Sequence, residues 1–110
     1  MEARAELELV LLAGLRQLGA AHGYALLAEL RGRSSGEFDF AEGTAYPVLH
    51  RLEQAGLIDG EWDTSGPRRR RVYRLTPAGE SALTDKASSW ARRSHLIQKL
   101  ISHRRAEAWT

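Results

Sequence analysis

Apolar residues recur every three or four positions near the start of the chain, which predicts an amphipathic helix over about residues 2–18, ended by Gly19. The same spacing predicts a second helix over about residues 22–31. The apolar positions that define these two helices are Leu7, Leu11, Leu15, Leu18, Leu26, Leu27 and Leu30. Apolar and polar residues alternate at 38–40, which predicts one very short strand.

A third helix is predicted to begin at Thr44, whose hydroxyl suits the N-cap position. Pro47 then falls in the first turn, where a missing N–H costs nothing. The core-facing positions of this helix are Val48, Leu49 and Leu52, and Gly56 ends it. Residues 57–62 and 68–75 alternate on either side of a Thr-Ser-Gly-Pro turn, which predicts a β-hairpin.

The last helix has a strong start, with Thr76 as N-cap and Pro77 at the first helical position. It is predicted to continue to about Arg104, about 27 residues or roughly 40 Å. Since a domain of this size is only about 30 Å across, the helix should extend beyond its own core. Its apolar stripe then needs a partner, most economically a second copy of the chain. The stripe consists of Leu83, Ala87, Trp90, Ile97 and Ile101.

The length of 110 residues leaves room for one core. The absence of cysteine excludes disulfides, thiol nucleophiles and cysteine zinc sites, and it fits a reducing compartment. No apolar run approaches the ~20 residues of a membrane span, and the acidic beginning of the chain does not look like a signal peptide. We therefore expect a cytoplasmic protein with no membrane partner.

Charge is distributed unevenly, although the net charge is only +2. Residues 37–63 are predominantly acidic, whereas residues 64–110 are predominantly basic and include the run Arg68–Arg71. All but two of the 16 basic residues are arginine, which binds phosphates and guanine edges in a bidentate manner more readily than lysine does. This asymmetry indicates an anionic partner.

The order helix, helix, short strand, helix, hairpin, long helix predicts a mainly α (α+β) fold. This fold is a winged helix-turn-helix with a long C-terminal dimerisation helix. We expect residues 1–76 to form the DNA-binding winged helix-turn-helix and residues 77–110 to form the dimerisation helix.

Four stretches of the chain form an ordered set of motifs: His22-Gly23-Tyr24, Gly43–Pro47 with Leu49, Arg51–Glu53 and Gly56–Ile58, Arg68–Tyr73 with Leu75–Gly79, and Trp90. In these motifs the chain resembles the PadR family of transcriptional repressors, which respond to phenolic acids or to multiple drugs. The resemblance extends from about Leu7 to Leu100 and is closest to the short subfamily with a single C-terminal helix. Two positions depart from it: the family usually has Leu where Ala45 stands and often has Pro where Glu42 stands.

The third helix is the expected recognition helix, whose N-terminal residues reach base edges in helix-turn-helix proteins. Thr and Ala can contact a thymine methyl group, and Arg and His can donate to guanine. The candidate DNA contacts on this helix are Thr44, Ala45, Tyr46, His50 and Arg51. The alternative is that Tyr46 packs in the core and that Arg51 pairs with Glu53 or another acid.

The hairpin is the expected wing. Arg68 and Arg70, nearest its tip, are the candidate phosphate or minor-groove contacts. Arg71 and Arg74 can instead pair with acidic residues of the strand at 59–63.

The resemblance places His22 and Tyr24 against the DNA backbone, at a helix N-terminus that attracts phosphate. The alternative for Tyr24 is that it only packs the second helix on the third. The resemblance also implies that Trp90 and its two-fold mate flank a planar aromatic or phenolic effector. Ser94, one helical turn further on, is the candidate polar contact. The alternative is that Trp90 fills the dimer core.

No catalytic or metal-binding pattern stands out. His95 and His103 are eight positions apart, which is not the spacing of a helical metal site, and we expect no cofactor. We therefore expect a homodimeric, sequence-specific regulator that binds a palindromic operator in double-stranded DNA, a repressor relieved by a small aromatic effector rather than an enzyme. The alternative is a winged-helix protein–protein interaction module without sequence-specific DNA binding, which would lack the salt dependence of duplex binding.

Overall fold

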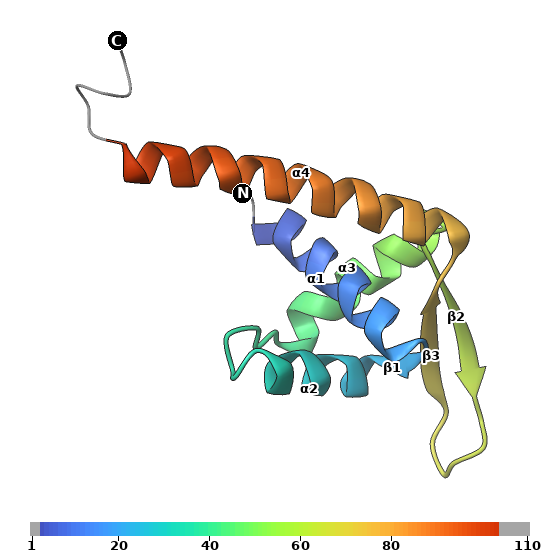
Figure 1. The fold of residues 1–110 in the computed structure, drawn as a ribbon. Helices are drawn as coiled ribbons and strands as arrows, with labels where there is room; N and C mark the ends of the chain where they lie inside the picture. Colours follow the sequence, from blue (N-terminus) through green and yellow to red (C-terminus); the bar gives the residue numbers. More distant parts are fainter. Residues whose placement is uncertain (1–2, 104–110) are drawn as a thin grey trace.

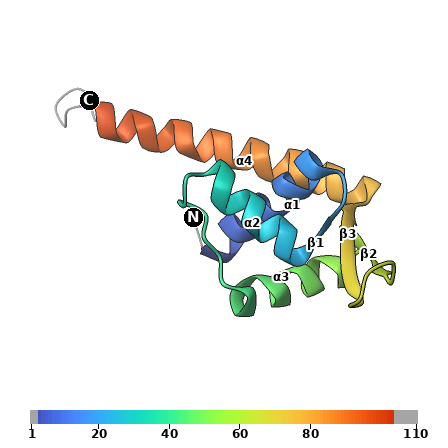
Figure 2. The ribbon, with the colours of Figure 1, turned by 90° about the horizontal axis from the view of Figure 1, so that it is seen from below.

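The computed structural model describes residues 3–103, which form four helices and a small sheet. In chain order the elements are α1 (Ala3–Leu18), β1 (Ala21–His22), α2 (Gly23–Arg33), α3 (Glu42–Gln54), β2 (Ile58–Asp63), β3 (Arg70–Leu75) and α4 (Pro77–Ser102). Figures 1 and 2 show α1, α2 and α3 gathered in one body, the β2–β3 hairpin at one end of it, and α4 running along α1 and beyond the body. The predicted winged helix-turn-helix with a long last helix is confirmed.

The three strands form an antiparallel sheet in the order β1-β3-β2. The short strand outside the hairpin is β1, Ala21–His22, which pairs with β3. Residues 38–40, for which a strand was predicted, do not form one. The prediction of a strand at 38–40 was wrong because Phe38 and Phe40 stack on each other, with ring centroids 6.0 Å apart, and pack against the helical core instead. Their alternation therefore reflects two aromatic anchors in a connecting segment and not a strand.

The core is built mainly from leucines of the first three helices. Its most deeply buried side chains are Leu11, Leu12, Leu15, Leu26, Leu49 and Ile58. The predicted core face of α3 is confirmed, since Val48, Leu49 and Leu52 are all buried. Burying each such side chain contributes roughly 1.5–3 kcal/mol, so the shared core holds the three helices together.

The start of α3 differs from the prediction. The helix begins at Glu42 with Ala41 as its N-cap, so Thr44 lies inside the first turn, where its N–H donates to the Ala41 carbonyl at 3.0 Å. Pro47 consequently falls in the second turn, where it has no N–H to donate to the carbonyl of Gly43. Both residues are exposed, so water can satisfy that carbonyl.

The start of α4 agrees with the prediction. The Thr76 hydroxyl accepts from the Gly79 N–H at 3.0 Å and donates to the Gly56 carbonyl at 2.6 Å, which ties the helix start to the end of α3. The helix contains 26 residues, about 39 Å of helix. The predicted end near Arg104 lies outside the described residues.

The early part of α4 belongs to the body of the protein. Leu83 is only 4% exposed and joins the core, and Lys86 pairs with Glu8 of α1 at 3.3 Å. The prediction that Leu83 is a dimerisation residue was therefore wrong, because its side chain is buried in the core of its own chain. No helix within residues 3–103 combines the length and the apolar character needed to cross a bilayer.

Candidate nucleic-acid interface

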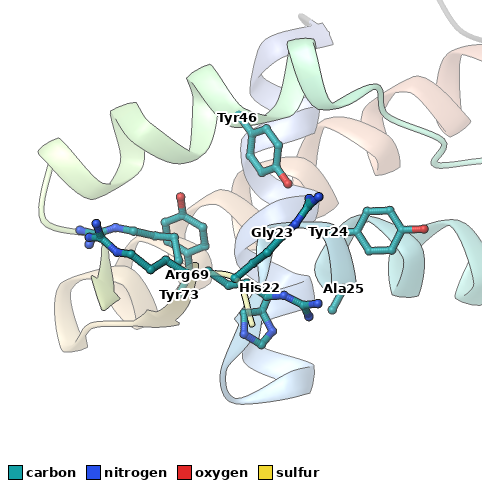
Figure 3. Close-up of a pocket in the computed structure, with 10 residues that line it drawn as sticks. His22, Gly23, Tyr24, Ala25, Tyr46, Arg69 and Tyr73 are labelled. Atoms are coloured by element: carbon teal, nitrogen blue, oxygen red, sulfur yellow. The ribbon is translucent and has the colours of Figure 1, made fainter. Parts of the chain in front are cut away.

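A groove of about 600 Å³ lies between the start of α2, one side of α3 and the tip of the β2–β3 hairpin. We call it the arginine groove. Its lining includes five residues that were predicted separately from the sequence: His22, Tyr24, Tyr46, Arg68 and Arg70. It also includes Arg69, Arg71 and Tyr73 (Figure 3). The fold thus brings two motifs and the basic run to one concave surface.

Tyr46 connects α3 to this groove. Its ring points from α3 toward Gly23 at the start of α2 (Figure 3), and a side chain at Gly23 would collide with the ring. Tyr46 remains 38% exposed, so it packs on α2 without entering the core. Partial burial, with a smaller contribution from Glu42, raises its pKa above the usual 10.0. The phenol therefore stays protonated near neutral pH and can donate a hydrogen bond to an anion.

The arginine run divides into groups with different partners. Arg71 forms an ion pair with Glu53 of α3, and this hydrogen bond raises the pKa of Arg71 further above its usual value. The alternative in which Arg71 pairs with an acidic residue of the neighbouring strand is therefore wrong, and so is the alternative pairing of Glu53 with Arg51. Arg74 lies opposite Asp59 in the sheet register but forms no ion pair within residues 3–103.

Arg68 and Arg70 contribute two of the positive charges of the groove. Both are exposed, and neither forms an ion pair with any residue that the structure describes. Arg68 lies in the hairpin loop and Arg70 at the first position of β3. Because no carboxylate in the described part of the chain pairs with them, their charge is available to an anionic partner.

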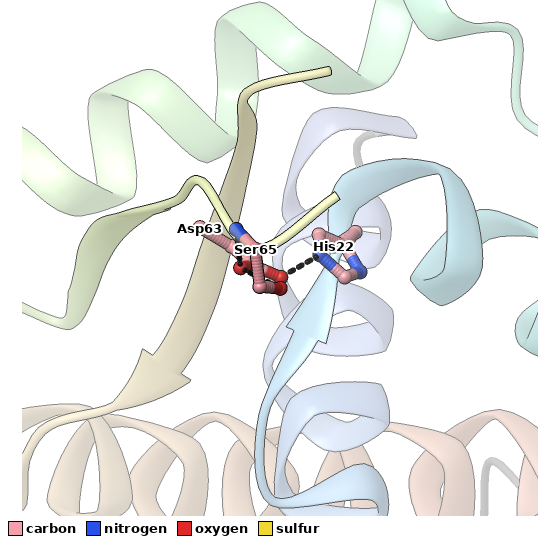
Figure 4. Close-up of polar contacts among 3 residues, drawn as sticks. All are labelled: His22, Asp63 and Ser65. Carbon is pink, nitrogen blue, oxygen red and sulfur yellow. Dashed lines mark hydrogen bonds and ion pairs between the residues drawn. The ribbon is translucent and has the colours of Figure 1, made fainter. Parts of the chain in front are cut away.

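His22 already has a protein partner. Its Nε2 lies 3.2 Å from Oδ2 of Asp63, the last residue of β2, so the pair links the start of α2 to the hairpin (Figure 4). Asp63 also accepts hydrogen bonds from the Ser65 hydroxyl at 2.6 Å and the Ser65 N–H at 3.0 Å. These Ser65 bonds, followed by the His22 bond, lower the pKa of Asp63 to about 2. His22 therefore lines the groove while it also holds the hairpin in place.

Tyr24 and the outward residues of α3 remain accessible. Tyr24 is 67% exposed, which excludes the alternative in which it only packs α2 on α3. Thr44, His50 and Arg51 are exposed along α3. Ala45 is fully buried, so it cannot contact a base, and its assignment as a DNA contact was wrong. The reason is helical spacing: Ala45 lies three, four and seven positions before the core residues Val48, Leu49 and Leu52.

The distal part of α4 carries a wide exposed apolar face. Trp90 is 49%, Ile97 53% and Ile101 71% exposed, and the predicted stripe residue Ala87 is exposed as well. The prediction missed Leu96 and Leu100, which are 54% and 58% exposed and broaden this face. Their four-residue spacing, next to Ile97 and Ile101, is the signal that could have found them. Ser94 is half-buried.

Sequence reasoning also missed Arg69, Tyr73 and Trp62. Tyr73 lines the groove because it lies opposite Ala21 in the sheet, and its burial raises its pKa above 10.0. The guanidinium group of Arg69 lies over the Trp62 ring, a contact between the two arms of the hairpin that only the tertiary structure reveals. Within residues 3–103 no three His, Cys, Asp or Glu side chains are grouped as a metal site.

The helices α1, α2 and α3 and a three-stranded sheet with a basic hairpin define a winged helix-turn-helix protein, in which one side of α3 is exposed. Residues 11–85 match the transcriptional regulator PadR-like family, and the chain belongs to this family. The resemblance seen in the sequence is confirmed. Members of this family are DNA-binding transcriptional regulators. The prediction of a regulator rather than an enzyme agrees with this family.

One curated relative carries a name that agrees with this assignment. Transcriptional regulator Rv3488 of Mycobacterium tuberculosis is 48% identical over 64 residues, a match that covers 58% of this chain and 57% of the relative. The chain thus spans little more than half the length of that relative. An uncharacterized protein of Lysinibacillus sphaericus is 31% identical over 77 residues, covering 69% of this chain and 71% of the relative.

Solved structures of similar proteins share the fold. A transcriptional regulator from Clostridium thermocellum superimposes with a TM-score of 0.83 at 26% identity, covering 90% of this chain and 96% of that chain. A PadR family transcriptional regulator from Eggerthella lenta gives a TM-score of 0.76 at 33% identity, covering 89% and 80%.

Proposed function

We propose that this protein is a homodimeric, sequence-specific DNA-binding repressor. The winged helix up to residue 76 serves as the DNA-binding unit and α4 as the dimerisation element. The observation that supports DNA binding most strongly is the arginine groove, which is lined by Tyr46 of α3 together with Arg68 and Arg70, neither of which forms an ion pair within residues 3–103. An anion along this groove would meet the guanidinium groups of these arginines and a protonated phenol.

The exposed side of α3 and the arginine groove contact different parts of the duplex. The exposed side chains of Thr44, His50 and Arg51 read base edges when α3 enters the major groove. Arg68 and Arg70 contact phosphates or the minor groove beside it and supply the salt-dependent affinity. Tyr24, exposed at the start of α2, contacts the backbone of the same duplex.

Dimerisation is supported by the exposed apolar face of α4, formed by Trp90, Leu96, Ile97, Leu100 and Ile101. A contiguous face of this kind is rarely left in water, and a second copy of the same helix covers it symmetrically. The two copies of α3 then bind the two halves of a palindromic operator in successive major grooves.

The effector site is proposed at the same face. Trp90 is about half exposed in the single chain, and Ser94 lies one turn further along α4. Two Trp90 rings related by the dimer axis can enclose a planar aromatic or phenolic molecule, with Ser94 as a hydrogen-bonding partner. Binding there shifts the dimer between two spacings of its recognition helices and so releases the operator.

The test of DNA binding is the salt dependence of duplex affinity, with a duplex pool of random sequence and then with the sequences selected from it. Replacing both Arg68 and Arg70 by Ala should weaken binding to all duplexes and lower the slope of log affinity against log salt by about one to two units. The matched control replaces Arg16 and Arg92, two exposed arginines outside the groove, and should leave the slope unchanged. Wild-type protein without salt-dependent duplex binding would instead support a protein–protein interaction module.

A further inference from the structure

Trp62 is a large aromatic side chain on the hairpin that remains 54% exposed. It lies directly opposite Arg71 in the register of β2 and β3, so both side chains occupy the same face of the hairpin. The guanidinium carbons of Arg69 and Arg71 lie 4.3 Å and 5.1 Å from the centroid of its ring. Both distances are within the range of a cation–π interaction.

Arg71 is fixed by three separate contacts. Its guanidinium pairs with Glu53 of α3, lies near the ring of Trp62, and occupies the space above Gly60. A Cβ atom at Gly60 would lie only 2.6 Å from the Nε of Arg71, so the bare glycine makes room for this side chain. The charge of Arg71 is therefore used inside the protein, where it fastens the hairpin and the Trp62 ring to α3.

Arg69 has a different environment. It is exposed, precedes the first residue of β3, and forms no ion pair with a residue in the described part of the chain. Its guanidinium group lies over the Trp62 ring. An arginine that stacks by its planar face keeps its N–H groups free at the edge, where they can bind a phosphate. Stacking also reduces the side-chain entropy that ordering on a phosphate would cost.

We propose that Trp62 is a positioning residue that holds Arg69 ready to contact a DNA phosphate in the arginine groove. Trp62 thereby divides the arginine run between an anchor, Arg71, and a phosphate-binding group, Arg69. The inference rests on the proposed DNA-binding function and adds a residue to it that carries no charge of its own.

The test uses the 110-residue chain and one selected duplex over a salt series from 50 to 200 mM. Trp62→Ala should lower the salt slope by about one unit although it removes no charge, because Arg69 no longer holds its phosphate. Across this fourfold salt range, affinity should then fall about three- to fourfold less than it does for wild type. Arg69→Ala should lower the slope equally, and the double variant should show no further decrease.

Trp62→Phe keeps a ring for Arg69 and should retain most of the wild-type slope. Arg74→Ala is a further control, since Arg74 is an exposed arginine of β3 that does not line the groove, and its loss should change the slope less than that of Arg69 does. If Trp62 has only a structural role, Trp62→Ala should reduce affinity equally at every salt concentration and leave the slope unchanged. That result would overturn the inference. Failure of the wild-type protein to bind duplex DNA with a salt dependence would overturn the proposed function itself.

Discussion

The ring of Tyr46 in α3 occupies the space beside Gly23 where a side chain would project from the first residue of α2. This contact joins two motifs that lie more than 20 positions apart in the chain, the His-Gly-Tyr start of α2 and the Gly-Thr-Ala-Tyr-Pro start of α3. It sets how closely the two helices of the helix-turn-helix approach each other, and it directs the Tyr46 phenol into the arginine groove.

Gly23→Ala should therefore destabilise the protein and weaken DNA binding together. The added methyl group must displace the Tyr46 ring, and overpacking of this kind costs typically about 1–3 kcal/mol. Urea unfolding measures the loss of stability. The control is Gly32→Ala near the end of α2, where no atom lies within 4 Å of the added carbon. That change should be neutral or stabilise by up to about 1 kcal/mol, and equal effects of the two substitutions would contradict the packing argument.

Asp63 should make stability depend on acid pH. Its hydrogen bonds with Ser65 and His22 lower its pKa to about 2 from an ordinary 3.8, so they favour the ionised carboxylate in the folded state. A depressed pKa contributes stability above the unfolded pKa, and that contribution is lost as the pH falls from about 4 toward 2.

The measurement compares the unfolding free energy of wild type and Asp63→Asn across this pH range. Asn keeps a carbonyl oxygen for Ser65 but cannot titrate, so the advantage of the wild type should shrink below pH 4. Asp85→Asn on the exposed side of α4 is the control for loss of the same charge. A difference between wild type and Asp63→Asn that stays constant with pH would contradict the prediction.

Ile97→Asp should prevent formation of the proposed dimer. Ile97 is 53% exposed in the single chain, and a carboxylate buried there without a partner would cost several kcal/mol. Analytical ultracentrifugation at micromolar concentration should find a wild-type dimer and a monomeric or aggregated variant. His95→Asp is the control, because two residues rotate the helix by about 200° and place His95 on another side of α4. A monomeric wild-type protein would contradict the proposal.

Trp90 should report on effector binding. Planar phenolic acids and cationic dyes should quench its fluorescence and weaken DNA binding, with stacking worth roughly 1–3 kcal/mol over two rings. Trp90→Ala should abolish both effects and leave the dimer intact. A background of Trp62→Phe and Trp109→Phe removes the other two emitters, of which Trp109 lies outside the described residues. If no compound quenches the wild type and Trp90→Ala dissociates the dimer, Trp90 is part of the dimer core instead.

The sequence alone determined most of the architecture. Helical spacing located α1, α2 and the core face of α3, the Thr76-Pro77 pair located the start of α4, and the turn before the arginine run located the hairpin. These features follow from local chemistry, since the period of apolar residues, the capping hydroxyl and the turn residues act within a few positions of one another. The family resemblance rested on the same local motifs and was confirmed.

Only the tertiary structure decided which distant residues meet. Ala21 and His22 form a strand because β3 lies beside them, and Phe38 and Phe40 do not because the helical core receives their rings. Arg71 pairs with Glu53 of α3 and not with an acid of the adjacent strand. The physical reason is that a charge or a short strand has several possible partners along the chain. The choice among them depends on strand register and helix packing, which form only when the whole core assembles.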